Sequence, residues 1–218
     1  TNFLYGQPDG GPTHDAPQNG YLNRSRVSLD YIPRDNNHPY RPAIIFRMAE
    51  AYLSYAEALN ESSERMSHKQ EIIDNLNKIR HRAGIAEYGT GTDENGFTRI
   101  KINFSDQKEV RRLIHKERRV EFVGEGVRYH DLRRWKTAHY GIGNLNEQGE
   151  NPDWGVNGPD YGMNYYGTEY TDQGDNAFFK RTKYMDRVYP RKFYWYPIHQ
   201  SEIDKDPTLV QGPFWLGE

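Results

Sequence analysis

The chain has 218 residues, which is enough to bury one substantial core and sets a limit of one or two domains. Its formal net charge is −2, and because basic and acidic residues are interleaved, the extended positive surface that nucleic-acid binding requires is excluded. The absence of cysteine excludes disulfides, cysteine metal sites and thiol nucleophiles. No apolar run approaches the ~20 residues needed to cross a bilayer.

Residues 1–41 are predicted to form an irregular connector. Gly and Pro are frequent at the start, and an alternating patch from Tyr21 to Tyr31 could form a short extended stretch. The first residues carry no charged-then-apolar export signal and resemble a loop from the middle of a protein. We therefore expect regular structure to begin after this segment.

Two helices are predicted next, and they form an antiparallel hairpin. The first covers 42–60, because Pro42 suits a helix start and the apolar residues that follow recur on one helical stripe. The second covers 67–83, with Ser67 as the expected N-cap and Gly84 as the stop. Together they predict a core that is built by helices.

A second pair of helices is predicted over 106–124 and 126–136, after a Gly-rich connector. The two pairs begin roughly 60 residues apart, whereas a tetratricopeptide repeat has a period of about 34 residues. The period alone therefore does not predict a regular array of such repeats.

Three carboxylates recur at four-residue spacing in the third predicted helix: Glu117, Glu121 and Glu125. Carboxylates on one helix face could serve as the acid and base of a glycosidase. Basic residues at ion-pair spacing favour another interpretation, since a paired carboxylate has a lowered pKa and is a poor general acid at neutral pH. We predict structural ion pairs and no catalytic residue. The expected pairs are Arg118/Glu121, Glu125/Arg128 and Asp131/Arg134.

Neither a metal nor a cofactor is predicted. The eight histidines lack zinc-binding spacing, and no Gly-rich loop between a strand and a helix could cradle a phosphate. Two acidic segments, 93–96 and 172–176, could offer oxygen ligands to Ca²⁺, but neither follows the EF-hand ligand order. We expect both to be solvated turns.

Residues 139–196 form a long predicted loop region that is rich in aromatic residues. Flat aromatic faces bury the C–H surface of sugar rings, while polar loop groups bond the hydroxyls. The same side chains could instead fasten the loops to the helices, or contact a partner protein. Spacing in the sequence leaves these three alternatives open.

Five motifs stand in an order that resembles a known family. Residues 115–135 contain Glu-Arg-Arg-x-Glu-Phe, Glu-Gly-x-Arg and Asp-Leu-x-Arg-Trp. The other four lie at 46–58, 76–85, 195–198 and 202–211. Together they are similar to the SusD/RagB family of Bacteroidetes outer-membrane nutrient-binding lipoproteins. The resemblance covers the chain from about residue 40 and implies that 42–218 is the C-terminal region of a longer protein. The chain departs from the family pattern at His130, His199, Asp206 and 212–214.

The resemblance implies an all-α fold: a tetratricopeptide-like superhelix of helix pairs with long irregular loops. It also implies non-catalytic binding of oligosaccharide, or peptide in RagB-like members, at the surface of the bacterial outer membrane, with delivery to a SusC-like TonB-dependent transporter. The lipid anchor would lie in a missing N-terminal part. A helical protein-interaction scaffold is the alternative. The candidate ligand-binding residues are Tyr21, Tyr31, Trp154, Tyr161 and Tyr165.

Overall fold

The computed structural model describes residues 3–8, 10, 20–21, 23, 28, 30, 39–40, 44–141 and 155–216. The chain divides into two compact units. The helical unit is Ser25–His130, and the loop unit combines Thr1–Arg24 with Asp131–Glu218. The predicted boundary at 41/42 lies outside the described residues.

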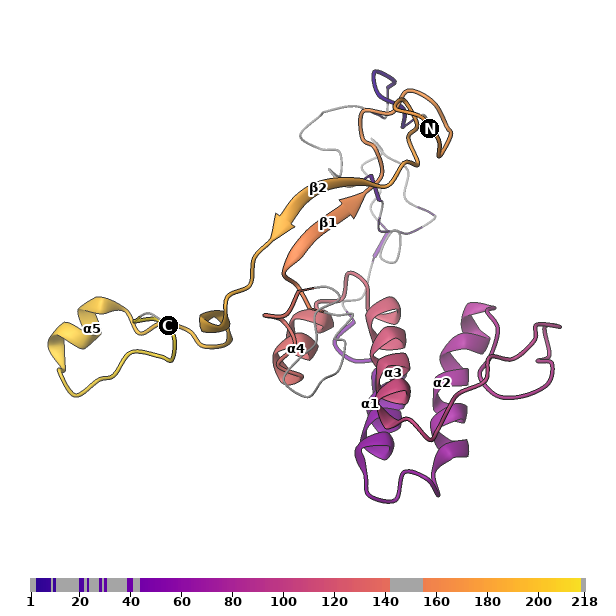
Figure 1. The fold of residues 1–218 in the computed structure, drawn as a ribbon, viewed down its shortest axis with the longest axis horizontal. Coiled ribbons are helices and arrows are strands. Elements are labelled where there is room, and N and C mark those ends of the chain that lie inside the picture. The colour runs from indigo at the N-terminus through magenta and orange to yellow at the C-terminus, as the bar shows by residue number, and fades with distance from the viewer. Residues whose placement is uncertain are drawn as a thin grey trace. The chain divides into compact units, whose positions relative to one another are not determined.

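Three helices build the helical unit: α1 (Met48–Glu61), α2 (Lys69–Ala83) and α3 (Gln107–Glu121). α1 packs against both α2 and α3, and α1 and α2 form the predicted hairpin (Figure 1). Apolar side chains at helical spacing face inwards, where burying each large one stabilises the fold by about 1.5–3 kcal/mol. The apolar side chains of the helical unit with no exposed surface are Leu53, Ala56, Ile72, Leu76, Val110 and Ile114.

The two ends of α2 differ in how well they agree with the sequence prediction. At its C-terminus Gly84 has a φ of 66°, a left-handed conformation that glycine adopts without strain, so the predicted stop is confirmed. The predicted N-cap is wrong. The hydroxyl of Ser67 donates to the carbonyl oxygen of Glu64 at 2.7 Å, and the helix begins two residues later, at Lys69.

The start of α1 also differs from the prediction. The helix begins at Met48 and not near Pro42, because the backbone of Arg47 is extended, with φ −143° and ψ 155°. The guanidinium of Arg47 forms ion pairs with Glu121 and Glu125. A contact with residues far along the chain therefore fixes the conformation of the residue that would otherwise continue the helix.

The predicted third and fourth helices are confirmed, although both are shorter than expected. Asp106 caps α3 by accepting hydrogen bonds from the backbone N–H groups of residues 108 and 109. α3 ends at Glu121, and α4 (Val127–Arg134) follows Gly124 and Gly126, whose φ angles are 78° and 80°. Two glycines in left-handed conformations cannot continue either helix, so they separate the two.

The loop unit contains a small sheet that the sequence did not predict. β1 (Gly158–Gly162) pairs antiparallel with β2 (Thr182–Arg187), and a 3-10 turn η1 (Arg191–Tyr194) and a short helix α5 (Gln200–Lys205) follow. The all-α prediction is therefore only roughly right. The register shifts between Asp160 and Tyr161, so β1 lacks the simple alternation that indicates a strand. The tetratricopeptide-like superhelix stays a prediction.

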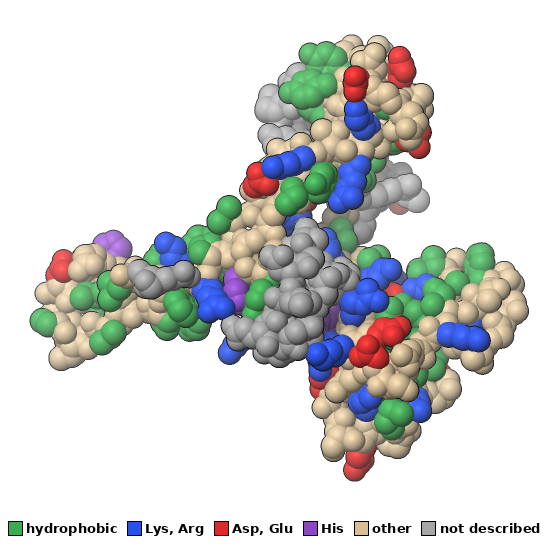
Figure 2. All heavy atoms as spheres, in the orientation of Figure 1, with side chains coloured by type: hydrophobic (Ala, Val, Ile, Leu, Met, Phe, Trp, Pro, Cys, Tyr) green, Lys and Arg blue, Asp and Glu red, His purple; other side chains and the backbone are tan. Residues whose placement is uncertain are grey.

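Figure 2 shows acidic and basic side chains mixed over the described surface, as the interleaved sequence indicates. No helix within the described ranges combines the length and the apolar character that crossing a membrane requires.

Candidate ligand-binding site

Four tyrosines of the loop unit, Tyr5, Tyr165, Tyr166 and Tyr170, are here called the tyrosine cluster. They come together because the N-terminal segment bonds to the loop that follows β1: the backbone N–H of Tyr5 donates to the carbonyl of Gly167 at 2.9 Å. Position 167 requires glycine, since a Cβ there would lie 2.4 Å from the Cα of Phe178. The close approach of these segments thus determines where the tyrosines lie.

Tyr166 is the most exposed member of the tyrosine cluster, with 64% of its surface accessible. Its ring centroid lies 5.5 Å from that of Tyr5 at 53°, and 5.7 Å from that of Tyr165 at 77°. Such tilted and edge-to-face pairs are the favoured packing of aromatic rings. Because the rings of Tyr5, Tyr165 and Tyr166 are inclined to one another, they do not form a coplanar arc, and Tyr166 offers the most exposed ring of the cluster.

Tyr170 fastens the cluster to the rest of the unit. Its hydroxyl accepts a hydrogen bond from the backbone N–H of Phe3 at 2.9 Å, and its ring packs against Phe178 and Phe179. Part of the aromatic content of this region therefore joins loop to loop, whereas the alternative that the sequence left open was the fastening of loops to helices.

The predicted ligand-binding residues lie in different surroundings. Tyr161, on β1, is 39% exposed, but the guanidinium of Arg181 lies 4.1 Å from its ring centroid and covers one face. Tyr165 is half-buried within the tyrosine cluster. Tyr21 is exposed. The preceding residue, Gly20, lies close to Met163, because a Cβ at position 20 would be only 2.9 Å from the Cβ of Met163.

Two of the predicted residues, Tyr31 and Trp154, lie outside the described residues. Conversely, the sequence analysis did not select Tyr166 as a candidate. The adjacent pair Tyr165-Tyr166 was the available signal, but the two residues lie in a turn, and the sequence does not indicate which of them faces solvent.

The carboxylates of α3 are bound by basic side chains, which confirms the prediction of structural ion pairs. Glu117 is 5% exposed and accepts from Arg80 at 2.5 Å and from the Tyr88 hydroxyl at 2.8 Å. Burial, and then the negative charge of Glu117, raise the pKa of Tyr88. Arg82 donates a hydrogen bond to each of the two carboxylate oxygens of Glu121.

The partners of these carboxylates differ from those that helical spacing suggested. Glu121 and Glu125 share Arg47, and Glu121 also pairs with Arg82 of α2 at 2.5 Å. The local pair Asp131/Arg134 is present at 3.1 Å. These acids hold elements of the fold together.

The two acidic turns that could have offered ligands to Ca²⁺ are held by hydrogen bonds and an ion pair within the protein. The Asp93 carboxylate accepts from the backbone N–H groups of Glu87, Asn95 and Phe97. Asp93 itself is 6% exposed, but the other residues of this turn, 94–96, are exposed, as expected of a solvated turn. Burial opposes ionisation of Asp93, but these hydrogen bonds outweigh it and lower its pKa. In the second turn Asp175 is exposed and pairs with Lys180 at 2.8 Å.

Comparison with known proteins agrees with the resemblance seen in the sequence. Two SusD-like proteins of Formosa agariphila are 33% identical to this chain over 109 and 103 residues, which is 50% and 47% of the chain. The matched segments are 18% and 19% of those proteins. A crystal structure of a SusD-like protein from Bacteroides fragilis superposes with a TM-score of 0.51 and 27% identity. That superposition covers 79% of this chain and 26% of the other.

The chain therefore spans about a fifth to a quarter of the length of the proteins that it matches. The match to the family described as the SusD family is more extensive, since it covers residues 2–215. The ordered motifs, the similar fold and this match together lead to one conclusion: the chain belongs to the SusD family.

Proposed function

We propose that this chain contributes to non-catalytic binding of oligosaccharide at the bacterial cell surface, for delivery to a SusC-like TonB-dependent transporter. Family membership supports the proposal. The observation that carries it for this part of the protein is the exposed ring of Tyr166 within the tyrosine cluster. An exposed ring beside polar loop groups matches the amphipathic surface of a sugar.

The paired acids of α3 support a binding role over hydrolysis. General acid catalysis needs a carboxyl group that can reach the substrate and donate a proton to it, whereas these carboxylates are held by arginines. Arg80 lies against Glu117, and Arg82 against Glu121. We therefore expect Glu121→Gln to reduce stability without abolishing any turnover of sugar.

The test is calorimetric titration of the purified chain with a panel of neutral oligosaccharides, combined with product analysis of the same mixtures. The expected result is saturable binding with the sugar intact. Tyr166→Ala should weaken binding roughly tenfold, because an aromatic anchor often dominates an interface. It should leave the free energy of unfolding within about 0.5 kcal/mol, as expected for an exposed position.

Tyr55→Ala is the matched control. Tyr55 is a tyrosine of α1 that is 49% exposed and lies outside the tyrosine cluster, so its removal should not change sugar affinity. Cleaved product that disappears in Glu121→Gln would contradict the non-catalytic role. Binding of peptides in place of sugars would favour a RagB-like ligand.

A further inference from the structure

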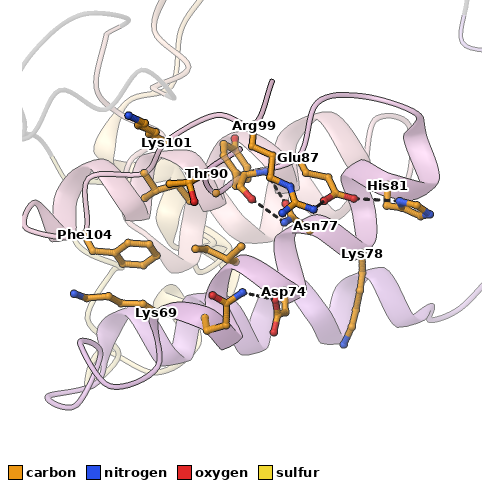
Figure 3. A pocket seen from close by; sticks show the side chains of 15 residues that line it. Lys69, Asp74, Asn77, Lys78, His81, Glu87, Thr90, Arg99, Lys101 and Phe104 are labelled. Carbon is orange, nitrogen blue, oxygen red and sulfur yellow. Dashed lines mark hydrogen bonds and ion pairs between the residues drawn. The ribbon is translucent and has the colours of Figure 1, made fainter. Parts of the chain in front are cut away.

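A groove in the helical unit shares no residue with the tyrosine cluster and has no role in the proposal above. It has a volume of about 730 Å³ and runs between α2 and the segment 86–104 (Figure 3). Small-molecule sites commonly have volumes of about 300–1,000 Å³. The groove is therefore large enough for several sugar rings.

The walls of the groove are held in place by hydrogen bonds. The side chain of Asn77 on α2 accepts from the Tyr88 backbone N–H at 2.7 Å and donates to its carbonyl at 2.9 Å. At the other end Arg65 donates to the Phe104 carbonyl at 2.8 Å. These contacts fix the segment 86–104 to α2 at one end and to the connection between α1 and α2 at the other, so the groove is formed before any ligand arrives.

Basic side chains outnumber acidic ones among the residues that line the groove. Four basic side chains, Lys69, Lys78, Arg99 and Lys101, face two acidic ones, Asp74 and Glu87, in a chain whose overall charge is −2. Arg99 is paired with Glu87 at 2.9 Å, and the ammonium of Lys78 lies 4.3 Å from the ring centroid of Tyr52.

Lys69 and Lys101 are left as the available cations of the groove. Within the part of the chain that the structure describes, neither ammonium has an ion-pair partner. Figure 3 shows both at the end of the groove where the Phe104 ring lies, on opposite sides of that ring, while Glu87, Arg99 and His81 lie at the other end. One end of the groove therefore combines an aromatic ring with two lysines that form no ion pair within the described residues.

We propose that this groove binds an acidic oligosaccharide. The partly buried Phe104 and Ile102 offer apolar surface to a sugar ring, and a carboxylate or sulfate on that sugar pairs with Lys69 and Lys101. The exposed Thr90 side chain supplies a hydroxyl for hydrogen bonding within the same groove. This inference rests on the proposed function and adds a substrate class and a second subsite to it.

The test compares three tetrasaccharides of equal length by calorimetry with the full chain: a neutral oligogalactan, a sulfated oligogalactan and an oligogalacturonate. At low salt at least one acidic ligand should bind roughly tenfold more tightly than the neutral one, since two partly exposed ion pairs together give about that factor. The sulfated and carboxylated arms distinguish the two kinds of acid group. Raising the salt from about 20 mM to about 300 mM should remove most of this preference.

Lys69→Gln/Lys101→Gln should reduce the affinity for the acidic ligand to that for the neutral one and leave neutral binding unchanged. Lys116→Gln/Lys205→Gln removes the same charge from exposed positions outside the groove and should retain the preference. This control separates a local ion pair from the effect of net charge.

Four results would overturn the inference. If the Lys69/Lys101 double variant keeps the preference, the groove is not the site. If a tetraglutamate peptide binds as tightly as the acidic sugars, the groove recognises charge and not sugar. If all three sugars bind equally, the acidic site fails while the proposed function stands; if the folded chain binds no sugar at all, both fail.

Discussion

At the scale of single residues, Glu117 shows why a charged helix can also be a core helix. Its carboxylate accepts from Arg80 and Tyr88, and all three side chains are buried. Removing the counter-charge of a buried guanidinium lowers the free energy of unfolding strongly, whereas removing one neutral hydrogen bond lowers it much less. The two kinds of contact at this carboxylate can therefore be separated by mutation.

Glu117→Gln should lower the free energy of unfolding by about 3 kcal/mol, because it leaves the Arg80 charge unpaired in the core. Tyr88→Phe should lower it by only about 1 kcal/mol, because it removes one hydrogen bond. Urea denaturation at neutral pH measures both. Equal losses in the two variants would mean that the ion pair contributes no more than the hydroxyl does.

The sequence predicted that the acids are paired, but it could not identify most of their partners. Asp131 and Arg134 are three residues apart on one helix, so spacing is sufficient there. Arg47 and Glu121 are 74 positions apart in the chain, and only the packing of α1 against α3 brings them together. The same holds in the loop unit, where Arg181 covers the Tyr161 ring from 20 positions away.

At the scale of elements, the β1–β2 pair depends on one acidic side chain. Asp160 accepts from the Tyr184 hydroxyl at 2.7 Å and from Arg187 at 2.5 Å, and both partners lie on the opposite strand. Burial opposes ionisation of Asp160, but these two contacts outweigh it and lower its pKa. The charged form is thus favoured by folding, and the contribution is present above the pKa of the unfolded chain.

Acidification should therefore loosen the β1–β2 pair. Because the folded pKa of Asp160 is below its unfolded value of about 4, its contribution is lost as the pH falls from about 4 through the folded pKa. Amide NMR signals of 158, 160–162 and 182–187, followed from about pH 6 to about pH 2, should show this transition. It should be absent in Asp160→Asn, which is already weakened at pH 6, and unchanged in Asp172→Asn. An identical acid transition in Asp160→Asn would assign it to other groups.

Local signals predicted the helices better than the strands. Apolar spacing located α1 to α4, and Gly84 and Asp106 marked an end and a start correctly, because those signals act within a few residues. β1 contains Gly and Pro and a register shift, so its sequence resembles a loop. It forms a strand only because β2, some 20 residues later, supplies the hydrogen bonds.

At the scale of the whole molecule, the chain is organised as two units, and their division does not follow the order of the sequence. The loop unit joins residues from both ends of the chain, Thr1–Arg24 and Asp131–Glu218. α4 crosses from one unit into the other between His130 and Asp131. No composition shift in the sequence marks that point, because the charged motif of residues 115–135 continues through it.

This organisation predicts that a local change destabilises one unit more than the other. Contacts that define a compact unit lie within it, so local opening should follow the units. In native-state hydrogen exchange, Glu117→Gln should increase exchange across α1, α2 and α3 and leave the β1 and β2 amides close to wild type. Asp160→Asn should give the reverse pattern, and the α4 amides should report which unit controls the shared helix. If both variants increase exchange equally throughout, the 218 residues unfold as one cooperative unit, and the stability of the tyrosine cluster then depends on the helical core.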